Sequence, residues 1–188
     1  MKKAATLLTL LLMSTAALFA QEKYGATEAE QQICKESLQI YKTFMDQKMD
    51  DNLVYKAWQT AHQECPCTAS ERLFSNGAKI IKKQIIASKE DKERLTVMID
   101  SLMMIYDERI ACYPSNKKYK DGMNAHYVAA LKAGDMKKLL PKQKEEAFKL
   151  METSVKALGN LATATLISNY YVDLYDHFKD APDEEKDM

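Results

Sequence analysis

The clearest helical pattern of the chain lies in residues 95–110, which read LTVMIDSLMMIYDERI. The apolar side chains of this stretch recur every three or four residues, at Leu95, Met98, Ile99, Leu102, Ile105, Tyr106 and Ile110. This period of about 3.6 is typical of a helix that buries one face. The pattern ends before Pro114, because the residue before a proline disfavours the helical conformation. We therefore expect a long helix here, and the same period extends in both directions along the chain.

Apolar stripes of this period predict three helices before residue 95 and three after residue 110. The third helix opens at a capping box formed by Thr68 and Glu71, and the fifth is capped by Gly134. Pro141 suits the first turn of the sixth helix. The six expected helices cover residues 28–48, 53–65, 68 to about 88, 117–132, 141–159 and 166–178.

The composition favours an all-α fold. The chain is 46% apolar and 29% charged, and its 5 Gly and 4 Pro are too few for the turns of an all-β protein. The helix stops at Pro66, Pro114 and Gly159 lie 48 and 45 residues apart, with two helices between successive stops. Such spacing predicts a stack of about three antiparallel helix pairs, a right-handed α-solenoid. The alternative is a compact helical bundle.

The first residues have the pattern of a secretory signal peptide. Lys2 and Lys3 precede an apolar stretch, residues 4–19, and the small residue Ala20 offers a cleavage site. The stretch is shorter than the roughly 20 residues of a membrane-spanning helix. We expect cleavage after Ala20 and a periplasmic or secreted protein without stable membrane insertion.

The remaining chain is long enough for one domain with a sizeable core. We expect residues 1–20 to be the signal peptide, 21–27 a linker, 28–179 a single helical-repeat domain and 180–188 an acidic, disordered tail. Loss of Lys2 and Lys3 leaves 25 basic against 27 acidic residues. This balance argues against nucleic-acid binding, which depends on an excess of basic residues.

Four cysteines, Cys34, Cys65, Cys67 and Cys112, lie where they could join antiparallel helices. Cys34 and Cys65 are 16 and 15 residues from a turn near Asp50, and Cys67 and Cys112 are 23 and 22 residues from a turn near Glu90. Cysteine pairs in an exported protein are expected to form disulfides, although four cysteines permit three connectivities. The spacing favours Cys34 with Cys65 and Cys67 with Cys112.

An alternative places thiol or zinc chemistry at His62, Cys65 and Cys67, with Cys112 or water as a fourth ligand. Pro66 lies inside this group, and no second ligand pair is visible. The chain also lacks an HExxH motif, a nucleophile elbow and a glycine-rich phosphate loop. We therefore expect no catalytic residue, no metal and no cofactor.

Several segments resemble the N-terminal region of exported tetratricopeptide-repeat-like proteins of Gram-negative bacteria. The most specific is Ile99 to Ile110; sparser matches are Cys34 with Tyr41, Tyr55 with Trp58, Cys65-Pro66 and residues 77–80. The spacing here is longer than the 34 residues of a standard repeat. Proteins of this kind are often longer, which leaves open a short paralogue or a truncated chain.

The resemblance implies a non-catalytic scaffold or adaptor of the periplasm or cell envelope that binds a protein or peptide partner. A structural subunit of an envelope assembly is a further alternative. Tyrosine provides large contact area with a hydrogen-bonding tip. The candidate partner-binding residues are therefore the tyrosines of the C-terminal half, Tyr119, Tyr127, Tyr170, Tyr171 and Tyr175.

Overall fold

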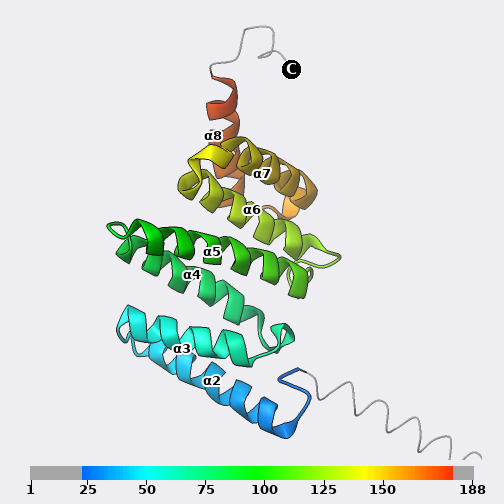
Figure 1. The fold of residues 1–188 in the computed structure, drawn as a ribbon. Coiled ribbons are helices and arrows are strands. Elements are labelled where there is room, and N and C mark those ends of the chain that lie inside the picture. The colour runs from blue at the N-terminus through cyan, green and yellow to red at the C-terminus, as the bar shows by residue number, and fades with distance from the viewer. Residues whose placement is uncertain (1–22, 180–188) are drawn as a thin grey trace, which may run out of the picture. The chain divides into compact units, whose positions relative to one another are not determined.

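Every regular element between residues 23 and 179, the part of the chain that the computed structural model describes, is helical. The expected all-α class is confirmed over this range (Figure 1). The expected signal peptide and acidic tail lie outside the described residues. The α-helices are α2 (Glu28–Asp46), α3 (Asp51–Glu64), α4 (Glu71–Ala87), α5 (Lys92–Cys112), α6 (Met123–Leu139), α7 (Lys144–Leu158) and α8 (Ala164–Phe178). Short 3₁₀ turns cover Cys67–Ala69, Pro141–Gln143 and Gly159–Leu161.

Side-chain caps fix where several helices begin. Thr27 and Glu30 form a reciprocal capping box at the start of α2, so that two otherwise unpaired backbone N–H groups gain acceptors. Asp50 accepts hydrogen bonds from the first turn of α3, and Asp91 does the same for α5. These polar residues were visible in the sequence as the turns between apolar stripes.

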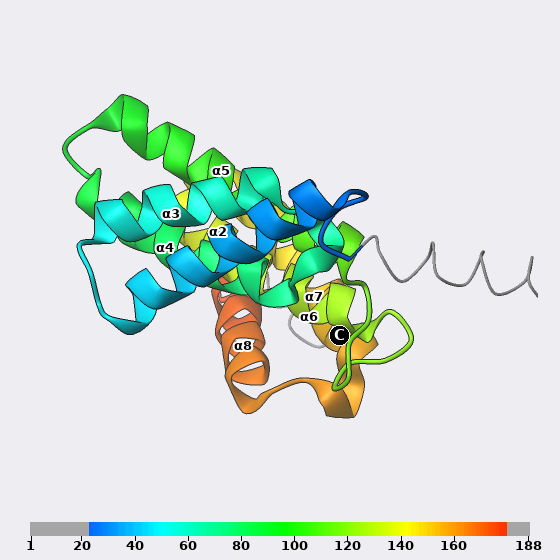
Figure 2. The ribbon, with the colours of Figure 1, turned by 90° about the horizontal axis from the view of Figure 1, so that it is seen from below.

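The described residues divide into two compact units between Ala87 and Ser88. In the first unit α2 and α3 form an antiparallel hairpin, and α4 packs against α3 (Figure 2). Trp58 of α3 is buried, and its indole Nε1 donates to the carbonyl of Leu73 over 2.8 Å. A Cβ at Gly77 would lie only 2.4 Å from Cζ2 of Trp58. Glycine at this position is what allows α4 to approach α3 so closely.

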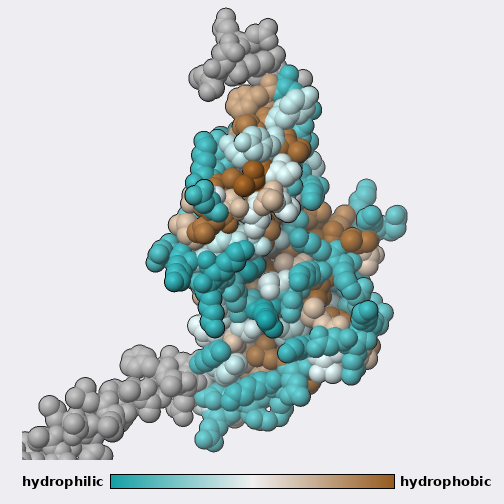
Figure 3. Space-filling model, turned by 180° about the vertical axis from the view of Figure 1, so that it is seen from behind, coloured by the Kyte–Doolittle hydropathy of each residue, from teal (hydrophilic) through white to brown (hydrophobic). Residues whose placement is uncertain are grey.

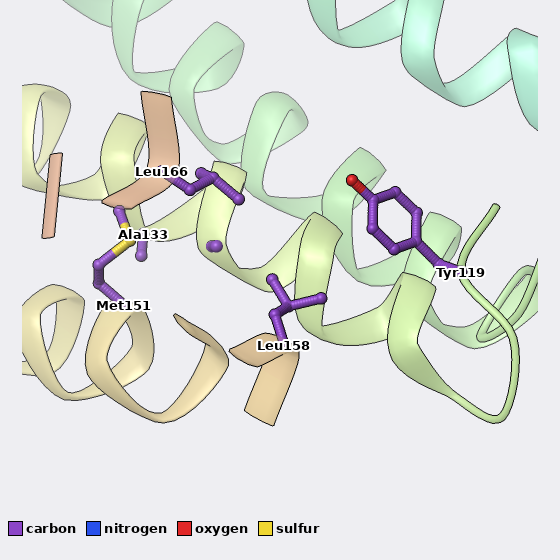
Figure 4. Packing of buried hydrophobic residues seen from close by; sticks show 6 residues of the cluster. Tyr119, Ala133, Met151, Leu158 and Leu166 are labelled. Carbon is purple, nitrogen blue, oxygen red and sulfur yellow. The ribbon is translucent and has the colours of Figure 1, made fainter. Parts of the chain in front are cut away.

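In the second unit α6 packs against both α5 and α7, and α8 crosses the α6 and α7 hairpin. Figure 4 shows the core that these helices enclose, where the side chain of Met151 of α7 reaches Ala133 of α6 and Leu166 of α8 belongs to the same cluster. Leu158 and Tyr119 extend the same cluster. The core therefore fixes which side of α8 faces inward.

A side-chain network shapes the loop between α5 and α6. Asn116 Oδ1 accepts from the backbone N–H groups of Lys118 and Tyr119, at 2.9 and 2.8 Å. The amide of Asn116 also donates to Asn124, which is fully buried and itself donates to the carbonyl of Tyr113. Side chains here replace helical backbone hydrogen bonds, which holds residues 113–122 out of a helix.

Three expected helix boundaries were wrong. The fifth helix was expected over residues 117–132, but α6 begins at Met123, because the asparagine network and Gly122 at φ +81° form a loop first. The helix then continues past Gly134, which packs inside it instead of ending it. Thr68 lies in a 3₁₀ turn, so the capping box expected at Thr68 and Glu71 does not open α4.

Candidate partner-binding surface

The last helix, α8, begins at a side-chain cap and buries one side. The hydroxyl of Thr163 accepts from the backbone N–H of Leu166 over 3.3 Å, which satisfies a free donor of the first turn. Leu166 and Asp173, seven residues apart, are the buried positions of the helix. Residues at this spacing share one face of a helix, so the orientation of α8 in the second unit is defined.

The opposite side of α8 presents large apolar and aromatic side chains to solvent. Tyr171 and Tyr175 are 65% and 71% exposed, and Val172 and Ile167 are also exposed. Ile167, Tyr171 and Tyr175 follow one another at intervals of four residues and therefore form a stripe. We call these four residues the α8 face. Figure 3 shows apolar side chains among polar ones below the grey C-terminal residues, in the part of the surface to which α8 belongs.

A charged network holds the other side of α8 against α6. Lys137 of α6 forms an ion pair with Asp173 and a second with Asp176, whose Oδ2 is 3.0 Å away. Partial burial works to lower the pKa of Lys137, but the hydrogen bonds to Asp173 and Asp176 outweigh it and raise the pKa. The same hydrogen bond from Lys137 lowers the pKa of Asp176. Both groups stay ionised near neutral pH, so the network persists there.

Ring contacts and hydrogen bonds join α8 to α7. The imidazole of His177 stacks on the ring of Phe148 with a centroid distance of 4.2 Å, and its Nδ1 is 3.5 Å from Glu145. Tyr170 donates from its hydroxyl to Glu152 over 3.3 Å. Phe148, His177 and Glu145 line a small cavity of about 380 Å³ together with the Lys137 network, and most of the groups that line it are charged. Most of the lysines and carboxylates that line the cavity pair with one another, and these ion pairs anchor α8.

The structure separates the five candidate tyrosines into two groups. Tyr119 is only 3% exposed and belongs to the core, and Tyr127 stacks on it with a centroid distance of 4.7 Å. Tyr170 is half-buried between α7 and α8. Tyr171 and Tyr175 alone of the five are freely exposed, and they lie on one helix. The candidate surface therefore includes two of the five tyrosines that the sequence indicated.

Sequence reasoning did not assign Val172 and Ile167 to a surface, although a signal was present. Apolar residues occur on every side of α8, at Leu166, Ile167, Tyr171 and Val172 among others. A helix with apolar residues on more than one side carries more hydrophobic surface than one neighbour can cover. The surplus on α8 could have been inferred from this pattern.

The cysteines lie in disulfides. Cys34 of α2 is bonded to Cys65 at the end of α3, the pair that the sequence favoured, and both residues are buried. Cys67 and Cys112 are disulfide-bonded as well, and no cysteine of the described residues is free. These disulfides fit an oxidising, extracytoplasmic location.

The His62, Cys65 and Cys67 group has no free thiol in this structure. The ring of His62 stacks on Trp58 at 5.2 Å and meets Phe74 edge-on, so it is part of the aromatic packing between α3 and α4. Within residues 23–179, His, Cys, Asp and Glu side chains form no group of three or more that could hold a metal ion.

None of the helices from residue 23 to residue 179 has the combination of length and apolar character that crossing a bilayer requires. No model of a protein family, no curated protein and no solved structure matches the chain.

Proposed function

We propose that this protein is a non-catalytic protein-interaction scaffold of the periplasm or cell envelope, built from tetratricopeptide-like helix pairs, which binds a partner through the α8 face. The α8 face carries this proposal, because two tyrosines and two aliphatic residues are exposed on a helix whose other side is fixed. Exposed apolar groups of this kind cost little when scattered, but a contiguous patch favours association.

The chemistry of the face suits a protein partner. Tyr171 and Tyr175 belong to a residue type that is enriched at interface hot spots, because a tyrosine side chain buries a large area with few rotatable bonds. Val172 and Ile167 add apolar area beside them. Since the core of the second unit and the Lys137 network hold α8 in place, little ordering of this helix is needed on binding.

Three local features support the tetratricopeptide-like part of the proposal. The helices of the described range are 14 to 21 residues long and are joined mostly by short turns. Consecutive helices form hairpins, α2 with α3 and α6 with α7. A glycine, Gly77, lies where α4 approaches the large side chain of Trp58. Helix pairs of this kind stack when no single hairpin can bury its own apolar face.

Chemical cross-linking in intact cells followed by capture of the tagged protein tests the proposal. We expect a reproducible partner with the wild-type chain and an about tenfold or greater loss of capture with Tyr171→Ser combined with Tyr175→Ser. The matched control is Val97→Ser combined with Met104→Ser, which removes two exposed apolar side chains from α5. Equal capture by both double variants, with folding unchanged by circular dichroism, would overturn the role of the α8 face.

A further inference from the structure

A groove in the first unit concentrates basic side chains between α2 and α4. Two hollows of about 580 and 640 Å³ share Met45 and Lys79 in their walls, so they adjoin and together make up the recess. We call this recess the basic groove. Its basic residues are Lys23, Lys42, Lys48, Arg72, Lys79 and Lys83.

The groove has a larger excess of basic over acidic residues than the unit that contains it. Residues 23–87 include nine Lys and Arg and eight Asp and Glu, which is close to neutral. The groove takes six of the nine basic residues but only three of the eight acids, Asp46, Asp50 and Asp51. A recess lined mainly by one sign of charge concentrates the field and attracts the opposite sign.

Two of the three acids already have partners. Asp50 accepts the backbone N–H of Asn52 at the start of α3, over 2.9 Å. Asp51 pairs with Lys83 over 2.7 Å. Their charges are therefore partly taken up by α3 and by Lys83, and they do little to neutralise the rest of the groove.

The central cations, in contrast, have no counter-ion among the residues that the structure describes. Lys42, Arg72 and Lys79 are exposed, and none of the three forms an ion pair with another residue of the range 23–179. Arg72 lies near the phenol of Tyr41, and Tyr41 and Asn76 both line the same groove. The groove thus offers three open positive charges beside side chains that donate and accept hydrogen bonds.

The size and form of the groove restrict the class of ligand. Each hollow alone has the volume of a small-molecule site, about 300 to 1,000 Å³, and two in series are too long for one small anion. A recess does not match the flat surface of a bilayer. The near-neutral charge of the chain disfavours nucleic acid, whose affinity comes from a broad excess of basic residues.

We propose that the basic groove binds an extended acidic segment of a protein partner. Carboxylates along such a segment pair with Lys42, Arg72 and Lys79, and its backbone meets the amide of Asn76. This inference goes beyond the proposed function, because it concerns a surface distinct from the α8 face and names the chemistry of the segment bound there. Recognition of acidic motifs by clustered basic side chains is a recurring mode of peptide binding.

A defined peptide tests the groove directly. The probe is a fluorescein-labelled octapeptide of alternating Glu and Ser, and binding to the purified chain is measured by fluorescence anisotropy at low and at physiological salt. We expect saturable binding that weakens with salt, and an about tenfold or greater loss of affinity for Arg72→Glu combined with Lys79→Glu. Lys56→Glu combined with Lys89→Glu, at exposed positions outside the groove, makes the same change in net charge and should retain most of the affinity.

Three outcomes would overturn the inference: no saturable binding of the peptide, equal loss with both double variants, or binding of heparin or of vesicles with anionic lipid that depends on Arg72 and Lys79 while the peptide does not bind. Arg72→Gln combined with Lys79→Gln, which removes the charges without reversing them, guards against misfolding and should give a smaller loss. This test uses a purified peptide and variants of the basic groove, whereas the α8 proposal is tested by capture from cells with variants of α8. Failure of either test therefore leaves the other proposal standing.

Discussion

The hydroxyl of Tyr106 donates a hydrogen bond to Oδ2 of Asp135 over 2.6 Å and thereby joins α5 to α6. Tyr106 is buried, and burial raises the pKa of its phenol well above the ordinary range. The hydrogen bond and the negative charge of Asp135 raise that pKa further, and only Arg109 opposes the rise. The phenol therefore remains a neutral donor at every physiological pH.

Replacing Tyr106 by Phe should lower the free energy of unfolding by about 1.5–3 kcal/mol at pH 7, because a hydrogen bond to a charged acceptor is lost. Urea denaturation followed by circular dichroism measures the change. Tyr171→Phe, at an exposed position, is the control and should shift stability by less than about 0.5 kcal/mol. Similar values for the two variants would show that the bond contributes little.

The raised pKa of Tyr106 predicts a loss of stability in alkali. The folded state holds the phenol proton more tightly than the unfolded chain, whose tyrosines titrate near pH 10. The stabilisation is therefore fully present below about pH 10 and is lost as the pH rises further. The raised pKa of Lys137 acts in the same direction. Thermal melts from pH 8 to 11.5 should show a falling Tm above about pH 10, with a shallower fall for Tyr106→Phe; parallel curves would contradict the assignment.

Long apolar stripes made most of the fold predictable. The bounds of α5 and the end of α7 at Gly159 follow from periodicity and from a proline or glycine beyond the last turn. The start of α6 did not, because Asn116 and Asn124 satisfy backbone groups through contacts that no local pattern encodes. The presence of a helix can be predicted from apolar residues that recur along the chain, whereas the start of α6 depends on contacts between a few side chains in the folded protein.

The candidate surfaces were less predictable than the helices. The composition of the C-terminal half indicated tyrosines as contact residues, but only packing separates buried Tyr119 from exposed Tyr175. The cations of the basic groove, at positions 42, 72 and 79, are far apart in the sequence and are not part of any run of charge. They lie near one another because Lys42 is on α2, Arg72 and Lys79 are on α4, and both helices line the groove.

Removing the disulfide between Cys34 and Cys65 by replacing both with Ala should lower the free energy of unfolding of the first unit by about 3–4 kcal/mol. The bond closes a loop with a sequence separation of 31 residues and so restricts the unfolded chain. Urea denaturation without reductant measures the loss. A change in the free energy of unfolding below about 1 kcal/mol would indicate that the unfolded chain gains little conformational freedom when the disulfide is removed.

The connectivity of the other two cysteines is a separate prediction. Trypsin leaves Cys65 and Cys67 on one peptide, residues 57–72, so a digest without reduction should yield a single three-peptide assembly. Fragmentation of this assembly between Cys65 and Cys67 in the mass spectrometer should assign the Cys34 peptide to Cys65 and the Cys112 peptide to Cys67. Rapid alkylation at low pH before digestion is the control against exchange between the neighbouring Cys65 and Cys67. A recovered link from Cys34 to Cys67 would contradict the pairing.

Two glycines on helices should respond in opposite ways to substitution by Ala. At Gly134 a Cβ would meet only Met151 Cε at 3.8 Å, an ordinary contact, so Gly134→Ala should stabilise α6 by about 0.5–1 kcal/mol through its better helix propensity. At Gly77 the same Cβ would lie 2.4 to 2.8 Å from three atoms of the Trp58 indole.

The Trp58 ring has little freedom to move away from a Cβ at position 77. It is buried, its Nε1 is held by the carbonyl of Leu73, and its ring stacks on His62. Overpacking of this kind costs about 1–3 kcal/mol and should exceed the gain in propensity, so Gly77→Ala is expected to destabilise the first unit by about 1–2 kcal/mol. Urea denaturation of both variants beside the wild type compares the two sites under identical conditions. Equal stabilisation by both substitutions would show that α4 can shift away from α3, and that the close approach at Gly77 does not constrain this helix pair.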